Sequence, residues 1–321
     1  MLTTRFTTLV GCLVPIQQAG MGGVATAELA AAVADAGGLG MLGAIRLPAP
    51  FLTQVLDQLN QQTRGVFGVN FLMPFLDRSC VELASSKAKV VEFFYGDPAA
   101  DLVKLVHTEG ALACWQIGSV DEARAAVAAG CDFIVAQGVE AGGHVRGRIG
   151  LLSLLDQVLA AVSVPVVAAG GIGSARTMAA ALAAGADAVR VGTRFVAATE
   201  SAAHALYKEA LVKASAEDTV LTEVFSVKWP GAPHRVLRSC VKAAEVCQEE
   251  FVGETEVAGS KLSLPRFSTP TPTRLTTGII EAMAHYAGES VSAVRGIQPA
   301  AEIVRALAEG AEQLLRTWSA R

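Results

Sequence analysis

Short apolar segments alternate regularly with alanine-rich segments of helical length over the first two-thirds of this chain. The apolar segments, such as residues 164–169, are apolar throughout and do not alternate with polar residues. Continuous apolarity predicts strands that are buried on both faces, as in a parallel sheet covered by helices. Eight such strands are expected, at residues 14–17, 40–42, 66–70, 90–94, 111–116, 133–137, 164–169 and 188–191.

Helices are expected between these strands, because alanine is the strongest helix former and glycine ends several of the segments, as at Gly37, Gly130 and Gly185. The expected helices cover residues 26–36, 48–60, 98–109, 120–129, 151–162, 175–184 and about 202–214. This alternation favours a TIM (β/α)8 barrel. A doubly wound open sheet is the alternative, and the absence of a GxGxxG sequence after the first strand disfavours it.

The barrel is expected to occupy residues 1–217, because the alternation is lost near Asp218. Pro230, Pro233 and Pro265 interrupt the segment that follows, and two helices are expected near residues 277–287 and 299–317. Residues 218–321 are therefore predicted to form an appended C-terminal, mostly helical subdomain packed near the barrel mouth.

Composition excludes several classes of protein. Of the 321 residues, 52% are hydrophobic and 17% charged, which predicts a folded α/β protein and not a disordered one. The net charge of −4 and the lack of basic clusters argue against nucleic-acid binding. No apolar stretch reaches the roughly 18–20 residues of a membrane span. Six scattered cysteines without a CxxC pair predict free thiols in the cytoplasm. The oligomeric state is open, with a homodimer as one option.

Candidate functional residues follow the carboxyl ends of the expected strands, where barrels carry their active sites. Gly170 and Gly171 follow the seventh strand, and Gly192 and Thr193 follow the eighth. Glycine lets backbone N–H groups approach an anion closely at the start of a helix, so these two turns predict a phosphate site. The other candidates are Gln18, Gly20 and Met21 after strand one, Asn70, Gln116 and Gln137 at strand ends, and Gly142, Gly143 and His144 after strand six.

The neutral amides of Asn70, Gln116 and Gln137 can match the donors and acceptors at the edge of a flavin ring without adding charge. The alternative is that they satisfy loop backbone groups. His144 is the candidate catalytic residue, because a histidine with a pKa near neutrality suits a general base. The alternative for His144 is a loop histidine held by backbone groups. No metal-ligand spacing and no GxSxG sequence occurs in the chain.

Several of these residues lie in motifs that resemble the nitronate monooxygenase family, formerly called 2-nitropropane dioxygenases. The motifs are PIQQAGM at residues 15–21, AAVADAGGLG at 31–40, FGVN at 67–70, QGVEAGGH at 137–144, AGGI at 169–172, GTRF at 192–195 and YAG at 286–288. The resemblance implies a barrel, FMN, and a catalytic histidine at His144. It also implies flavin contacts at Asn70, Gln137, Gly142, Gly171, Gly192 and Thr193.

The activity that this resemblance implies is the oxidation of alkyl nitronates, or of nitroalkanes, by O2 to a carbonyl compound and nitrite. The flavin-dependent enoyl-acyl-carrier-protein reductases carry a similar histidine loop and similar phosphate turns. An FMN- and NAD(P)H-dependent enoyl reductase is therefore one alternative, and a non-catalytic flavin-binding protein is another. The first motif favours the monooxygenase. Val145, which separates His144 from Arg146-Gly147, departs from the family pattern and leaves the substrate open.

Overall fold

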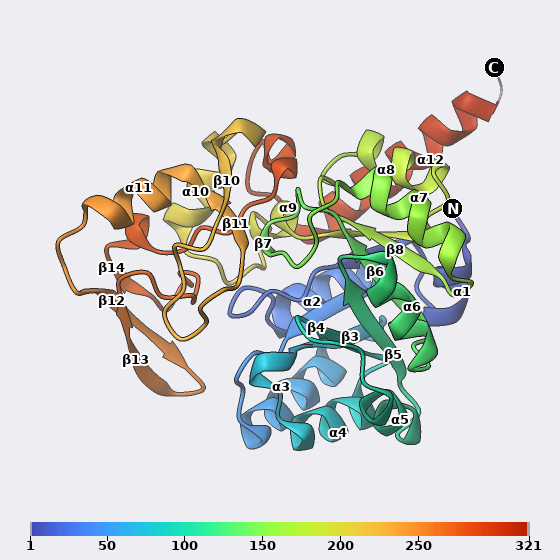
Figure 1. The fold of residues 1–321 in the computed structure, drawn as a ribbon, viewed down its shortest axis with the longest axis horizontal. Coiled ribbons are helices and arrows are strands. Elements are labelled where there is room, and N and C mark those ends of the chain that lie inside the picture. The colour runs from blue at the N-terminus through green and yellow to red at the C-terminus, as the bar shows by residue number, and fades with distance from the viewer. Residues whose placement is uncertain (1, 320–321) are drawn as a thin grey trace.

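Eight parallel strands form a nearly closed barrel in the computed structural model, which describes residues 2–319 (Figure 1). The barrel strands are β1 (Ile16–Gln18), β2 (Gly40–Gly43), β3 (Phe67–Leu72), β4 (Val90–Phe94), β5 (Leu112–Ile117), β6 (Phe133–Gln137), β8 (Val166–Ala169) and β9 (Ala188–Val191). They pair in the order β1, β9, β8, β6, β5, β4, β3, β2. The N–H of Gln18 donates to the carbonyl of Leu39 over 2.9 Å, which joins the two ends of this order. The expected barrel is confirmed.

Helices cover the outside of the barrel and bury apolar faces against the strands. They are α2 (Ala27–Asp35), α3 (Ala49–Gln62), α4 (Arg78–Lys87), α5 (Ala100–Thr108), α6 (Val120–Ala128), α7 (Leu151–Ala161) and α8 (Ala175–Ala183). Helix α4 was not expected, because its serines lower helix propensity. Asp77 starts it by accepting the N–H of Ser79 over 2.9 Å, as an N-cap residue does.

Two terminal helices complete the barrel. Helix α12 (Ala300–Ser319) was expected and packs against α8 and α2, where it closes the outer ring of helices. This helix lies on the barrel wall (Figure 1), whereas the sequence suggested a position near the mouth. Helix α1 (Arg5–Val10) was not expected. Its Phe6 is fully buried against Phe133 at the amino ends of the strands, with ring centroids 5.3 Å apart, so α1 closes the bottom of the barrel.

The segment after β9 leaves the barrel as a lobe beside its mouth (Figure 1). It contains α9 (Thr193–Val196), α10 (Ala205–Lys213) and α11 (Arg238–Val246). It is richer in strands than expected. Strands β10 (Thr219–Thr222) and β11 (His234–Leu237) form one sheet with β7 (Gly143–His144), which comes from the loop between β6 and α7. Strands β12 (Phe251–Val257), β13 (Ser260–Pro265) and β14 (Thr277–Gly278) form another.

The helix expected at residues 277–287 is not formed. Thr277 and Gly278 pair with β12, and a short 3-10 turn, Ile280–Ala282, follows them. Gly278 has a φ of 117°, a value that no helix interior adopts. Pairing with a strand distant in sequence therefore overrides the apolar pattern of this segment. Within residues 2–319, no helix combines the length and the apolar character that crossing a membrane requires.

Candidate active site

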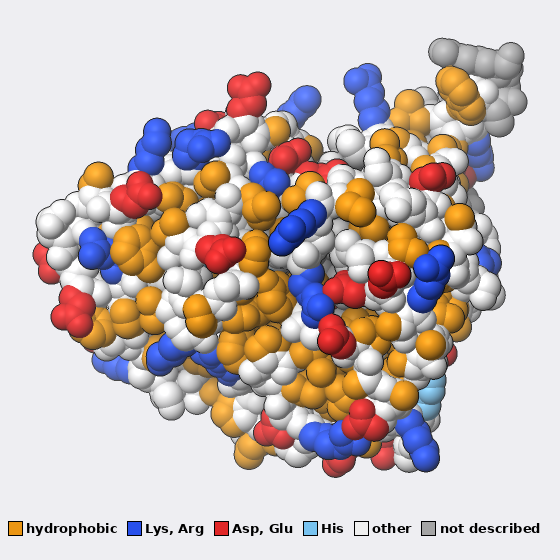
Figure 2. Space-filling view, in the orientation of Figure 1, with side chains coloured by type: hydrophobic (Ala, Val, Ile, Leu, Met, Phe, Trp, Pro, Cys, Tyr) orange, Lys and Arg blue, Asp and Glu red, His pale blue; other side chains and the backbone are white. Residues whose placement is uncertain are grey.

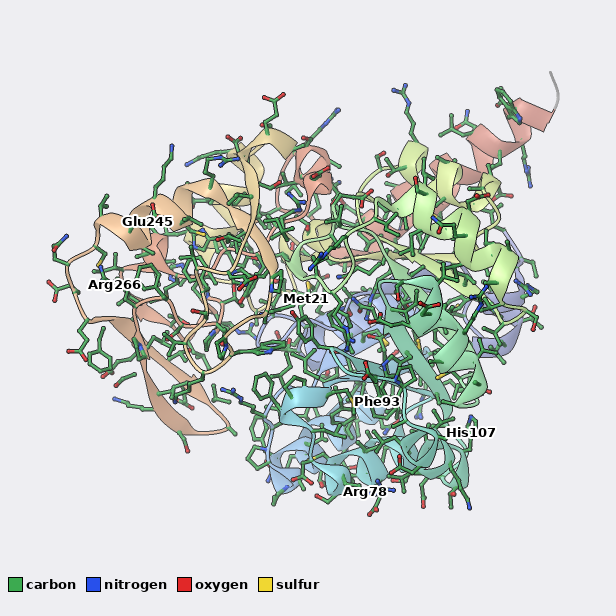
Figure 3. The ribbon with its side chains drawn as sticks, viewed as in Figure 1. Met21, Arg78, Phe93, His107, Glu245 and Arg266 are labelled. Carbon is green, nitrogen blue, oxygen red and sulfur yellow. The ribbon has the colours of Figure 1, made fainter. Side chains whose placement is uncertain are left out.

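A cavity of about 810 Å³ opens where the carboxyl ends of the barrel strands face the C-terminal lobe. Apolar side chains gather in the hollow between the two parts (Figure 2), and Met21 lies at their junction (Figure 3). The lobe contributes residues of β12, β13 and the segment around Trp229 to the wall. The size lies within the range of roughly 300–1,000 Å³ that is typical of ligand and cofactor sites.

Nearly all of the site residues predicted from the sequence come together in the wall of this cavity. They are Gly20, Met21, Asn70, Gln116, Gln137, Gly142, Gly143, His144, Gly170, Gly171, Gly192 and Thr193. Gln18 lies outside the wall: its side-chain oxygen accepts the N–H of Met41 over 2.9 Å, and its amide nitrogen donates to the carbonyl of Ala19. Gln18 therefore supports the turn after β1 and does not face the cavity.

The turns after β8 and β9 form a backbone cradle at one side of the cavity. Gly170 and Gly171 have φ values of 109° and 67°, which residues with a side chain rarely adopt. The turn leads into α8, which Ser174 caps by accepting the N–H of Thr177. A helix that starts at a cavity wall favours an anion there, because its dipole is positive at this end. Gly192, from the next turn, faces the same cradle with room beside its Cα.

His144 lies in a wall of aromatic rings. It belongs to β7 and pairs with His234 of β11, so two strands fix its backbone. Its imidazole stacks on Trp229, with ring centroids 3.9 Å apart and an interplanar angle of 19°, and it meets Tyr286 at 5.5 Å. The Nε2 atom of His144 is buried and has no hydrogen-bond partner among residues 2–319. A buried polar atom without a partner on the wall of a cavity indicates a ligand contact.

Burial determines the charge of His144. Desolvation, with a smaller effect of His234, lowers the pKa of His144 to about 3. His234 is neutral for a related reason: burial lowers its pKa, its Nδ1 donates to the carbonyl of Ala232, and its Nε2 accepts the N–H of Phe225. Both rings are therefore uncharged at neutral pH, and His144 offers a neutral imidazole to the cavity.

The upper layer of the barrel interior is polar, whereas the layers beneath it are apolar. Gln17, Asn70, Glu92, Gln116, Gln137 and Arg190 are all buried at this level. Below them, Leu39, Val90 and Phe133 pack with α1 in an apolar cluster. Sequence reasoning missed Glu92 and Arg190. The signal was present, since a charged residue inside an apolar strand, as in VVEFF or AVRV, must find a partner of opposite charge.

His107 and the six cysteines fall outside the site. His107, at the periphery in Figure 3, pairs with Asp132 over 2.8 Å. All six cysteines are free, and Cys12, Cys80, Cys114, Cys131 and Cys240 are buried. The part of the chain that the structure describes holds no group of three or more residues that could bind a metal ion.

Comparison with known proteins decides the family. The family model of nitronate monooxygenase matches residues 3–79 and 76–310, which is most of the chain. The chain belongs to the nitronate monooxygenase family. It is a flavin-dependent oxidoreductase by this membership, as the sequence motifs implied.

Single proteins that are similar to this chain support the assignment to this family. A Staphylococcus aureus protein (strain MSSA476) named "Probable nitronate monooxygenase" is 33% identical over 271 residues, covering 70% of this chain and 76% of that protein. FabK from Thermotoga maritima is 31% identical with a TM-score of 0.83, covering 100% and 99% of the two chains. Nitroalkane oxidase from Streptomyces ansochromogenes is 31% identical with a TM-score of 0.77, covering 98% and 99%.

Proposed function

We propose that this chain holds FMN at the barrel mouth and oxidises alkyl nitronates with O2 to a carbonyl compound and nitrite. The observation that carries the proposal is the neutral imidazole of His144, which lines the cavity that also contains the anion cradle and whose buried Nε2 has no partner within residues 2–319. Membership of the nitronate monooxygenase family and the likeness to a nitroalkane oxidase support this choice of substrate.

The residues present fit FMN. The cradle at Gly170, Gly171 and Gly192 suits a single phosphate, because glycines leave backbone N–H groups free of side-chain cover, and Gly170 and Gly171 have positive φ values. The polar layer suits the edge of a flavin ring, since the Oε1 atom of Gln137 is buried without a partner within the described chain. Met21, Asn70, Gln116, Gly142, Gly143 and Thr193 would complete the contacts. A bound flavin supplies the electron transfer and oxygen chemistry that side chains lack.

His144 would then bind and orient the substrate. A nitronate is already an anion, so it needs a hydrogen-bond donor more than a base. The neutral imidazole can donate from Nε2 in one tautomer, and a bound anion would raise the pKa of His144 and favour a proton on the ring. A neutral nitroalkane would instead need His144 as a base. Because a pKa of about 3 makes the imidazole a weak base, we expect the nitronate to be the better substrate.

The overall reaction balances without a further co-substrate: two nitronate anions and one O2 give two carbonyl compounds and two nitrite ions. The wall around His144 is aromatic and uncharged, because Trp229 and Tyr286 lie against the imidazole ring. A nitronate bound against this wall would exchange part of its hydration for aromatic surface. This desolvation strengthens the hydrogen bond that His144 would donate.

The variant His144→Ala tests this role with two substrates, a primary nitroalkane and its preformed nitronate, at equal FMN content. General-base catalysis is worth about 10²–10⁴ in rate. A loss at least tenfold larger for the nitroalkane assigns His144 as a base, and equal losses assign it as an anion-binding group. Unchanged rates with both substrates would contradict any role of His144 in the reaction.

A second candidate function is an NAD(P)H-dependent enoyl-thioester reductase. The cavity is far larger than a small nitronate, and the cationic side chains of Arg46, Lys228 and Lys261 stand in its wall, where they suit a long ligand with phosphate groups. The likeness to FabK fits this alternative. NADH oxidation by the FMN-loaded protein with a crotonyl thioester would favour the reductase, and its absence would favour the oxidase.

A further inference from the structure

A buried ion pair lies beneath the cavity. The carboxylate of Glu92 is fully buried and accepts hydrogen bonds from Asn70 over 2.6 Å, from Gln17 over 2.8 Å, and from the guanidinium of Arg190. Arg190 also donates to the side-chain oxygen of Gln116. Burying two charges costs several kcal/mol per ion, and apolar residues of similar size are often at least as stable. The pair is therefore poorly explained by stability alone.

The two charges differ in their distance from the cavity. Arg190 is part of the cavity wall, whereas Glu92 is enclosed beneath it by the donors that saturate its oxygens. The Nε atom of Arg190 is buried and has no hydrogen-bond partner in the region that the structure describes. A ligand in the cavity would therefore meet the cation before its counter-ion, and one N–H donor of that cation is free.

The position of Arg190 on β9 relates it to the anion cradle. Side chains alternate along a strand, so Arg190 shares the inward face of β9 with Ala188, and Gly192 follows the end of the strand directly. Arg190 and Gly192 both belong to the cavity wall. A ligand whose phosphate lies at Gly192 would thus extend the rest of its structure across the layer that holds Arg190. That layer is polar, so it can form hydrogen bonds with the edge of a ligand ring that is rich in carbonyl and nitrogen atoms.

We propose that Arg190 contacts the pyrimidine part of the flavin and raises its reduction potential, and that Glu92 is a positioning residue that moderates this effect. The inference rests on the proposed binding of FMN. Two-electron reduction with uptake of one proton leaves a negative charge on the pyrimidine ring, and the electrons come from the substrate. A cation beside that ring stabilises the reduced form more than the oxidised form.

Sulfite provides a test besides catalysis, because it adds to oxidised flavin and leaves the same negative charge on the ring. In FMN-loaded protein, we expect Arg190→Met to weaken sulfite binding ten- to hundredfold, and the potential to fall by about 30–60 mV at 29.6 mV per tenfold for two electrons. Arg190→Lys should restore much of the affinity. Glu92→Gln removes the counter-ion and should tighten sulfite binding.

Opposite shifts from Arg190→Met and Glu92→Gln distinguish an electrostatic role from a structural one, since damage to the fold would weaken binding in both. If Arg190→Met does not fold, the double variant with Glu92→Gln avoids an unpaired carboxylate and should bind sulfite more weakly than the wild type, by less than predicted for Arg190→Met alone. Lys208→Met is the matched control, because Lys208 is a buried cation that donates to Ala198 and Ser201 away from the cavity.

The outcomes separate this inference from the proposed function. FMN-loaded variants with the sulfite affinity and potential of the wild type would overturn the role of Arg190 and leave the FMN site intact. A wild-type protein that takes up no FMN would overturn the proposed cofactor, and this inference with it.

Discussion

The imidazole of His144 lies nearly parallel to the indole of Trp229, with ring centroids 3.9 Å apart. His144 follows a barrel strand, whereas Trp229 belongs to the lobe that is added after the barrel. The lobe thus does more than cover the mouth: it supplies the surface on which the candidate catalytic group rests and removes water from it. The lowered pKa of His144 is a consequence of this contact between the two parts of the chain.

Replacing Trp229 with leucine should change the charge of His144. A smaller side chain would admit water to the imidazole, so its pKa should rise from about 3 toward the ordinary value near 6.5. We expect an inflection in kcat/KM for a nitronate between pH 4 and 6.5, with a loss of about ten- to hundredfold from misplacement of the ring. Trp318→Leu is the control, since Trp318 is exposed on α12. The same pH profile in Trp229→Leu and wild type would contradict the stacking account.

The wild-type enzyme should show no titration of His144 near neutrality. The pH dependence of kcat/KM reports groups of the free enzyme, and burial keeps the pKa of His144 at about 3 there. With freshly prepared nitronate, kcat/KM should therefore show no inflection caused by His144 between pH 5.5 and pH 8. An inflection near pH 6.5 that disappears in His144→Asn would show that the ring is solvated.

Gly192→Ala should weaken FMN binding without unfolding the protein. An added Cβ would lie 3.5 Å from the Cβ of Ala19 and 4.0 Å from the sulfur of Met21, which are ordinary contacts, so the protein itself tolerates it. The methyl group would occupy the cradle, and we expect FMN affinity to fall about tenfold or more. Gly296→Ala is the matched control, because an added Cβ there would meet nothing within 4 Å and Gly296 is not part of the cavity wall. Measuring FMN affinity with the far-UV circular dichroism spectrum separates the two effects; wild-type affinity would place the phosphate elsewhere.

Acid should destabilise the protein through its buried histidines. Burial lowers the pKa of His285 to about 4, while its Nε2 donates to the carbonyl of Ile280. The folded pKa lies below the unfolded one, so this contribution to stability is complete above pH 6.5 and declines as pH falls toward 4. One such group lowers the free energy of unfolding by about 3 kcal/mol between pH 7 and pH 4. Chemical unfolding of wild type and His285→Gln at both pH values should show a smaller loss in the variant; equal losses would refute this assignment.

The barrel could be predicted because its signals are local. Strand β8 is apolar on both faces, and Gly185 ends the helix that follows it, so no distant contact is needed to recognise the unit. The same locality placed Gly170, Gly171 and His144 at strand ends, where the cavity lies. Asn70 and Gln137, which were also predicted as site residues, line the cavity because they too lie at strand ends.

The parts of the fold and of the site that could not be predicted depend on contacts between segments that are distant in the sequence. Thr277 and Gly278 could form a helix by pattern, but they pair with β12. Trp229 and Tyr286 follow no barrel strand, so position alone could not connect them with His144. The pairing of Glu92 with Arg190 spans strands β4 and β9. Charged residues inside apolar strands predict a partner, but only the closed barrel shows which one and where the cavity lies relative to it.

Oxygen uptake and nitrite release from FMN-loaded protein, supplied with propyl-2-nitronate and no NAD(P)H, measure the proposed reaction itself. We expect a bound flavin identified as FMN at about one per chain, steady oxygen consumption, and two nitrite ions released for each O2 consumed. The contradictory result is an FMN-loaded, folded protein that consumes no oxygen with any alkyl nitronate and oxidises NADH with an enoyl thioester instead.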